Sequence, residues 1–113
     1  MTVLTCAAVN GVALQRHAPE RLADVPQAMK RRTDRVLAVA AAHDVRRFIL
    51  GAWGCGAFGL EPEMMAGIFR DALLGAYRGV FEEIAFAITD WSPDERFIGP
   101  FRRAFSDPDD AQV

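Results

Sequence analysis

The pattern of apolar and polar positions along the chain predicts alternating strands and helices. Short apolar runs at Thr2–Cys6, Arg46–Leu50 and Ile84–Thr89 are typical of buried strands. Apolar residues spaced by three and four from Pro26 to His43, and again from Pro62 to Glu82, predict two amphipathic helices. Strands that alternate with helices indicate a parallel sheet with helices on both faces, because parallel strands need crossover connections.

A third helix is expected after the last strand. Ser92 and Glu95 form a capping box, and Pro93 occupies the first helical position. Pro100 falls inside the apolar pattern that follows, so we expect a kink or a break there.

The stretch between the first strand and the first helix, Ala7 to Glu20, lacks clear periodicity and is expected to be a long loop. Loops that leave the carboxyl ends of parallel strands line binding crevices in α/β folds. Asn10 is therefore a candidate ligand contact. The alternative is a turn-forming role, because Asn10 directly precedes Gly11.

The segment from Gly51 to Gly59 reads GAWGCGAFG and separates the second strand from the second helix. A loop so rich in glycine lets a ligand approach the main chain, and it can direct several N–H groups at an anion. This pattern predicts a phosphate-binding loop, with a tight turn that binds nothing as the alternative. The G-x-G-x-x-G motif within it lacks the acidic residue about 20 positions further on that dinucleotide binding requires.

Composition narrows the classes of function. The chain has 113 residues, of which 51% are hydrophobic and 25% charged, which suits one small globular domain. A formal net charge of −2 argues against nucleic-acid binding driven by bulk charge. No apolar run approaches the ~18 residues of a membrane span, and no signal peptide is visible. Metal-ligand spacing is absent among the cysteines and histidines, which are Cys6, Cys55, His17 and His43, so we expect no metal and no cofactor. A cytoplasmic location with both thiols reduced is the default expectation.

The run from Phe48 to Pro62, FILGAWGCGAFGLEP, resembles the hallmark of the microbial-type poly(ADP-ribose) glycohydrolases, which are macrodomain proteins. Val3–Asn10 and Ile84–Asp90 resemble flanking segments of that family in the same order, so the resemblance covers nearly the whole chain. It implies a partial macrodomain-like three-layer α/β/α sandwich over residues 1–105, with about three strands and three helices. Residues 106–113 are expected to be a disordered acidic tail.

The resemblance also implies a ligand, ADP-ribose or poly(ADP-ribose), without direct contact to nucleic acid or membrane. Main-chain N–H groups would bind the diphosphate at four positions: Gly54, Cys55, Gly56 and Ala57. Five further residues would lie close to the ligand: Gly51, Ala52, Trp53, Phe58 and Asn10.

The chain departs from the family in its catalytic segment. The family carries a glycine triplet followed by Gln-Glu-Glu in its N-terminal half, and the glutamate is the general acid that glycoside hydrolysis requires. This chain has no such segment and resembles the C-terminal half only, and Leu60 stands where the family usually has asparagine. We therefore assign no catalytic residue. The parent activity, hydrolysis of ribose–ribose O-glycosidic bonds in poly(ADP-ribose), is not expected of this chain alone.

Two other functions remain open. One is a non-enzymatic module that binds ADP-ribose or another nucleotide diphosphate. The other is a structural fragment that assembles through an open sheet edge, because a three-stranded parallel sheet leaves two edges exposed. The partner at such an edge would be a second copy, giving a homodimer, or the missing N-terminal half as a separate chain.

Overall fold

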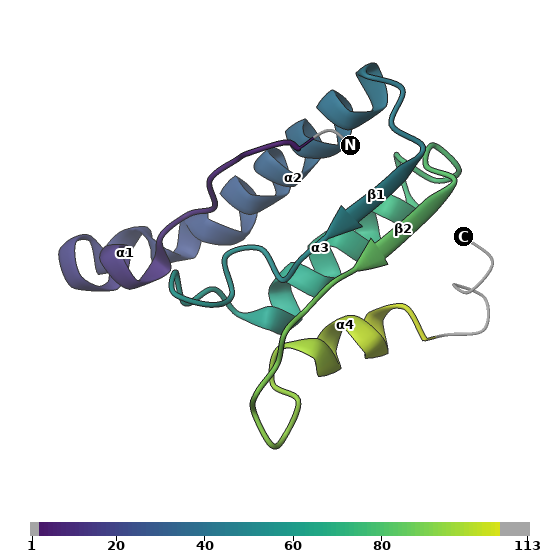
Figure 1. The fold of residues 1–113 in the computed structure, drawn as a ribbon. Coiled ribbons are helices and arrows are strands. Elements are labelled where there is room, and N and C mark those ends of the chain that lie inside the picture. The colour runs from purple at the N-terminus through teal and green to yellow at the C-terminus, as the bar shows by residue number, and fades with distance from the viewer. Residues whose placement is uncertain (1–2, 107–113) are drawn as a thin grey trace.

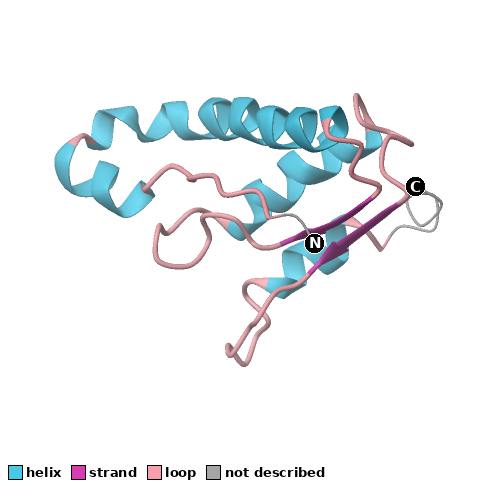
Figure 2. Cartoon of the chain, turned by 45° about the horizontal axis from the view of Figure 1, so that its top comes forward, coloured by secondary structure: helices cyan, strands magenta, loops and turns pink. Residues whose placement is uncertain are grey.

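A computed structural model describes residues 3–106 and shows a short parallel sheet packed against helices (Figure 1). The elements in chain order are α1 (Gly11–His17), the 3-10 helix η1 (Pro19–Asp24), α2 (Val25–Ala42), β1 (Arg47–Leu50), α3 (Pro62–Leu74), β2 (Glu83–Phe86) and α4 (Ile98–Ala104). β1 and β2 pair in parallel, with Arg47 opposite Glu83 and Leu50 opposite Phe86. Figure 2 shows how much more of the chain is helix and loop than strand.

Among residues 3–106, only one face of the sheet is covered. The inward positions are buried or half-buried: Phe48, Leu50, Ile84 and Phe86. The outward positions are exposed: Arg47, Ile49, Glu83 and Ala85. Helices α3 and α4 meet the inward face through an aromatic cluster, in which the Phe86 ring lies 5.5 Å from the Phe69 ring and 5.1 Å from the Phe101 ring. The predicted three-layer sandwich is therefore wrong for residues 3–106, which form two layers.

The core lies between this inward face and helices α2 and α3. Met29 and Leu37 of α2, together with Met65 and Phe69 of α3, are almost completely buried. Their spacing by three and four residues places them on one stripe of each helix, as the sequence pattern predicts. Helix α3 ends at Leu74, well before the predicted limit at Glu82. Within residues 3–106, no helix is long and apolar enough to cross a membrane.

The predicted first strand is wrong over its described residues, Val3–Cys6, and Thr2 lies outside them. This segment has no ladder partner, and a β-rich sequence becomes a strand only when a neighbour supplies hydrogen bonds. Two strands are therefore present in residues 3–106 where about three were expected. The predicted acidic tail, apart from Ser106, also lies outside the described residues.

The predicted long loop after this segment contains a helix instead. Asn10 is the N-cap of α1, and its Oδ1 accepts a hydrogen bond of 3.0 Å from the Ala13 N–H. An asparagine side chain at this position satisfies one of the N–H groups that the first helical turn leaves unpaired. The turn expected at Asn10 and Gly11 is thus the start of α1. With the 3-10 helix η1, the described chain has five helical segments where three were expected.

The predicted start of the last helix at Ser92 and Pro93 is also wrong, because Asp90 caps the helix further along. The Asp90 carboxylate accepts hydrogen bonds from the N–H groups of Phe97 and Ile98, at 2.8 and 2.9 Å, and from the Ser92 hydroxyl. These contacts place the start of α4 at Ile98. Pro100 then falls in the first turn, where no N–H is needed, so α4 has no kink.

Replacing Asp90 is expected to lower the melting temperature at neutral pH. The hydrogen bond from Ser92, followed by the backbone N–H of Ile98, holds the pKa of the Asp90 carboxyl well below its usual range. The unfolded chain therefore takes up this proton at a higher pH than the folded chain does, and the free energy of unfolding rises with pH. The contribution of Asp90 is fully present above about pH 5 and is lost on further acidification.

Thermal melts of Asp90→Ala and the parent chain across this pH range measure the effect. The difference in melting temperature between Asp90→Ala and the parent chain should be constant from neutral pH to about pH 5 and should narrow below it. Asp94→Ala, which removes an exposed carboxylate from the same turn, is the control and should melt with the parent. A gap that widens on acidification would contradict this role.

Candidate functional site

The glycine-rich segment Gly51–Gly59 forms the connection between β1 and α3. Because β1 and β2 are parallel, this loop and the turn around Asp90 both leave the carboxyl edge of the sheet (Figure 1). Ligand sites of open α/β sheets lie at this edge. The predicted strand–loop–helix arrangement is confirmed.

Leu60 closes the loop. Its N–H donates a hydrogen bond of 2.9 Å to the Gly54 carbonyl, and its side chain is buried beneath the loop. Gly54 adopts a φ of +79°, and a Cβ atom there would lie 2.5 Å from Leu60 Cδ1 and 3.0 Å from Ala8 Cβ. Only glycine fits this position without strain. Leu60, which departs from the family pattern, therefore supplies the apolar side chain that packs under Gly54.

Two tight turns shape the rest of the loop. The Cys55 N–H donates to the Ala52 carbonyl at 3.0 Å, and the Gly59 N–H donates to the Gly56 carbonyl at 3.0 Å. The Cys55 N–H, one of the four predicted diphosphate donors, is thus already engaged within the loop.

Between Gly54 and Phe58, four N–H groups have no acceptor among residues 3–106: those of Gly54, Gly56, Ala57 and Phe58. Gly56 and Ala57 are exposed, and a Cβ atom built on Gly56 would meet nothing within 4 Å. Exposed N–H donors on consecutive residues, with open space in front, are the arrangement that binds oxyanions. The structure thus leaves three of the four predicted diphosphate positions free to donate.

The Cys55 side chain is buried beneath the loop. Burial, together with the nearby Glu61 carboxylate, raises the pKa of its thiol to about 11. The thiol is therefore neutral at physiological pH, which excludes a thiolate nucleophile. A neutral group at this position also leaves the loop without a negative charge that would repel a phosphate.

The amino terminus of α3 follows the loop and carries two carboxylates. Glu61 is the N-cap and accepts a hydrogen bond of 3.3 Å from the Glu63 N–H, while Glu63 forms an ion pair with Arg103 of α4. The negative charges of both carboxylates offset the positive end of the helix dipole. This terminus is therefore less suited to an anion than the loop N–H groups are.

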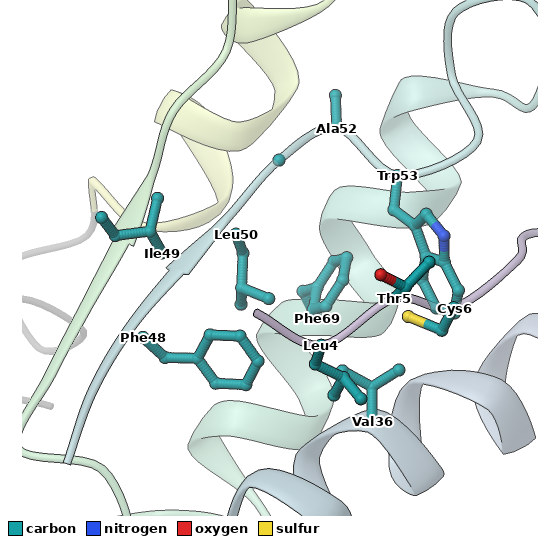
Figure 3. Close-up of a pocket in the computed structure, with 11 residues that line it drawn as sticks. Leu4, Thr5, Cys6, Val36, Phe48, Ile49, Leu50, Ala52, Trp53 and Phe69 are labelled. Atoms are coloured by element: carbon teal, nitrogen blue, oxygen red, sulfur yellow. The ribbon is translucent and has the colours of Figure 1, made fainter. Parts of the chain in front are cut away.

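The residues predicted to lie near the ligand fall into two groups. Gly51, Ala52 and Trp53 line a cavity of about 460 Å³ beside β1 (Figure 3). Phe58 is partly exposed at the outer end of the loop. Asn10 lies at the start of α1, where its side-chain oxygen is used by the helix cap. The loop and this cavity thus adjoin each other, and Asn10 is committed to α1.

Comparison with known proteins identifies what this arrangement resembles. No protein-family model and no curated protein sequence matches the chain. Among solved structures, poly(ADP-ribose) glycohydrolase from Deinococcus radiodurans in complex with ADP-ribose matches with a TM-score of 0.83 and 39% identity, over 86% of this chain and 39% of that chain. The enzyme from Thermomonospora curvata matches with a TM-score of 0.77 and 35% identity, over 85% of this chain and 35% of that chain.

The chain is related to the bacterial poly(ADP-ribose) glycohydrolases. It matches part of their macrodomain-like fold and spans about two fifths of the length of the Deinococcus enzyme. The family resemblance seen in the glycine-rich segment is confirmed.

One contact of this glycohydrolase-like loop was not predicted from the sequence. The Val12 N–H in the first turn of α1 donates a hydrogen bond of 3.1 Å to the Phe58 carbonyl. Gly11 permits this approach, because a Cβ atom there would lie 3.0 Å from the same carbonyl oxygen. The Asn-Gly pair at positions 10 and 11 was the available signal, since asparagine is a favoured N-cap as well as a turn residue.

Gly54→Ala is expected to destabilise the fold by about 1–3 kcal/mol, because it forces a side chain into positive φ and against buried Leu60. Gly56→Ala is the matched control. It lies two residues away, has open space, and should change the free energy of unfolding by less than about 0.5 kcal/mol. Urea denaturation of the two variants measures the difference. Equal stability of the two would show that Leu60 does not fix the loop.

Proposed function

We propose that this chain binds ADP-ribose and that the glycine-rich loop holds the diphosphate. The observation that carries the proposal is the set of unpaired N–H groups at Gly54, Gly56, Ala57 and Phe58, in a chain 39% identical to a glycohydrolase crystallised with ADP-ribose. A diphosphate needs several donors and close access to the main chain, and this loop offers both.

The surroundings of the loop support a dinucleotide-like ligand over a single phosphate. Trp53 lines the cavity beside β1, and Phe58, near the end of the loop in sequence, is exposed. Aromatic side chains of this kind pack against the apolar faces of a sugar or a base. We propose that Phe58 contacts the distal ribose while the N–H groups between the two aromatic residues hold the phosphates.

We further propose that the chain does not cleave poly(ADP-ribose) by itself. Cleavage of a glycosidic bond needs a carboxyl group placed to protonate the leaving oxygen. The two carboxylates beside the loop are committed elsewhere, Glu61 to the cap of α3 and Glu63 to Arg103. The role supported best is therefore recognition of ADP-ribose.

Calorimetric titration of the purified chain tests the binding proposal. ADP-ribose should bind with micromolar affinity, or about −8 kcal/mol, and AMP, which lacks the second phosphate, should bind far more weakly. Titration with ADP tests the alternative of a general nucleotide-diphosphate module. Equal affinity for ADP and ADP-ribose would show that the site recognises the diphosphate alone.

Gly56→Glu should reduce the affinity for ADP-ribose more than tenfold, because it places a carboxylate in the open space before the loop. Gly67→Glu is the matched control, because it adds the same charge in α3 where a Cβ atom also meets nothing within 4 Å. A folded parent chain that shows no heat of binding, or two variants that bind equally, would refute the loop as the site.

Incubation with poly(ADP-ribose) tests the absence of catalysis. The pure chain is expected to release no ADP-ribose, since it offers no free carboxyl group at the loop. Chromatography of the products, with the Deinococcus enzyme as the positive control, gives the answer. Release of ADP-ribose that is abolished by Glu61→Gln would overturn this expectation and identify the acid.

A further inference from the structure

Another cavity lies between α1 and the start of α2, which Figure 1 shows beside each other. It has a volume of about 540 Å³ and is lined by residues of α1, η1 and α2 together with Ala8 and Val9. Small-molecule sites have volumes of roughly 300–1,000 Å³, so this cavity is large enough for a ligand. We call it the α1–α2 cavity. It shares no lining residue with the cavity beside β1.

Helix α1 separates this cavity from the glycine-rich loop. Ala13, Leu14 and His17 line the cavity, and their spacing by three and four residues places them on one face of the helix. Val12 lies on the opposite face, towards the loop, because a Cβ atom on Gly59 would be 2.9 Å from Val12 Cγ2. The two sites are therefore distinct.

The charged side chains that line the α1–α2 cavity are Arg21, Arg31, Arg32 and Asp24. Three cations against one anion leave a net charge of +2 around it. None of the four forms an ion pair within residues 3–106. Arg32 is held in place, because its Nη1 donates a hydrogen bond of 3.0 Å to the Ala7 carbonyl. A guanidinium has five N–H donors, so this contact leaves others for a ligand.

The positive charge continues along α2. Lys30 and Arg35 line a smaller hollow of about 320 Å³, which shares Arg31 with the α1–α2 cavity. The only acidic residue of α2 is Asp34, whose Oδ1 accepts a hydrogen bond of 3.0 Å from the Tyr77 hydroxyl. It forms no ion pair with these cations. This surface is therefore positive, although the whole chain has a formal net charge of −2.

The rest of the cavity wall is apolar. Its apolar side chains are buried or half-buried: Ala8, Val9, Ala13, Leu14, Val25 and Ala28. Ligand sites typically combine such a wall with a few polar groups that fix the orientation of the ligand. An apolar wall beside unpaired guanidinium groups suits a ligand that has an apolar body and an anionic end.

We propose that the α1–α2 cavity binds a small phosphate monoester whose organic part is a ring-sized apolar group. A phosphate monoester carries a charge of about −1.5 to −2 at neutral pH, which balances the +2 of the lining. A carboxylate would balance only half of it. Guanidinium groups also bind phosphate through paired N–H···O hydrogen bonds. This site goes beyond the binding of ADP-ribose and does not depend on it, because no residue of the glycine-rich loop lines the cavity.

Titration of the ¹⁵N-labelled chain with phenyl phosphate, followed by nuclear magnetic resonance, tests the proposal. The N–H signals of Leu14, Ala28 and Arg31 should shift saturably, with a dissociation constant of about 1 mM or tighter. The signals of Gly56 and Ala57 in the loop should shift much less. Inorganic phosphate, which lacks the apolar body, should bind at least about threefold more weakly. Phenol, which lacks the phosphate, should give no saturable shift.

Arg21→Gln and Arg31→Gln should each weaken the binding of phenyl phosphate about fivefold or more, because each removes a guanidinium from the lining. Arg78→Gln is the matched control. It removes the same charge from an exposed arginine outside the cavity and should bind like the parent. The spectrum of each variant without ligand shows whether it is folded. Added salt should weaken binding to the parent, because Arg21 and Arg31 are exposed to solvent.

Several outcomes would overturn the proposal. The cavity is not a site if no signal shifts saturably up to about 10 mM phenyl phosphate, or if the parent and both cavity variants bind equally. Shifts confined to Gly54–Phe58 and abolished by Gly56→Glu would place the phosphate at the loop instead. Benzoate that binds as tightly as phenyl phosphate would show that the cavity does not select a phosphate. ADP-ribose is titrated separately, so failure of either binding event leaves the other proposal standing.

Discussion

Four residues of β1 pair in parallel with four residues of β2, and this short ladder fixes where the rest of the described chain lies. Parallel strands end at the same edge, so the glycine-rich loop after β1 and the Asp90 turn after β2 emerge together. Two parallel neighbours need a crossover connection, and here α3 supplies it, covers the inward face and buries Phe69 against Phe86. The ladder also leaves β1 with one unpaired edge.

The glycine-rich loop is held by contacts that need no ligand. Leu60 packs beneath Gly54, two turns fix the segment between them, and Val12 of α1 binds the far end at Phe58. A loop that is already ordered loses little conformational entropy when a ligand binds, so more of the contact energy appears as affinity. Neutral Cys55 beneath the loop adds no opposing charge.

Local sequence signals predicted the elements whose stability is local. The apolar stripe from Pro26 to His43 became α2, and the glycine-rich segment became the β1–α3 loop, because spacing and glycine content act over few residues. Two predictions were wrong because the outcome depended on contacts outside the segment itself. Val3–Cys6 has strand composition but no neighbour to pair with, and the capping box at Ser92 was displaced by Asp90, whose carboxylate reaches Phe97 and Ile98.

The residues of the candidate site could be named from the sequence, but their contacts could not. The glycine pattern pointed to free N–H groups, but it could not show that the Cys55 N–H is used by Ala52 or that Asn10 caps α1. Whether a backbone N–H group is free depends on the turn in which it lies. The sequence restricts the φ values that define a turn type, but it does not fix them. The buried role of Leu60 likewise required the folded loop, because only there does its side chain meet Gly54.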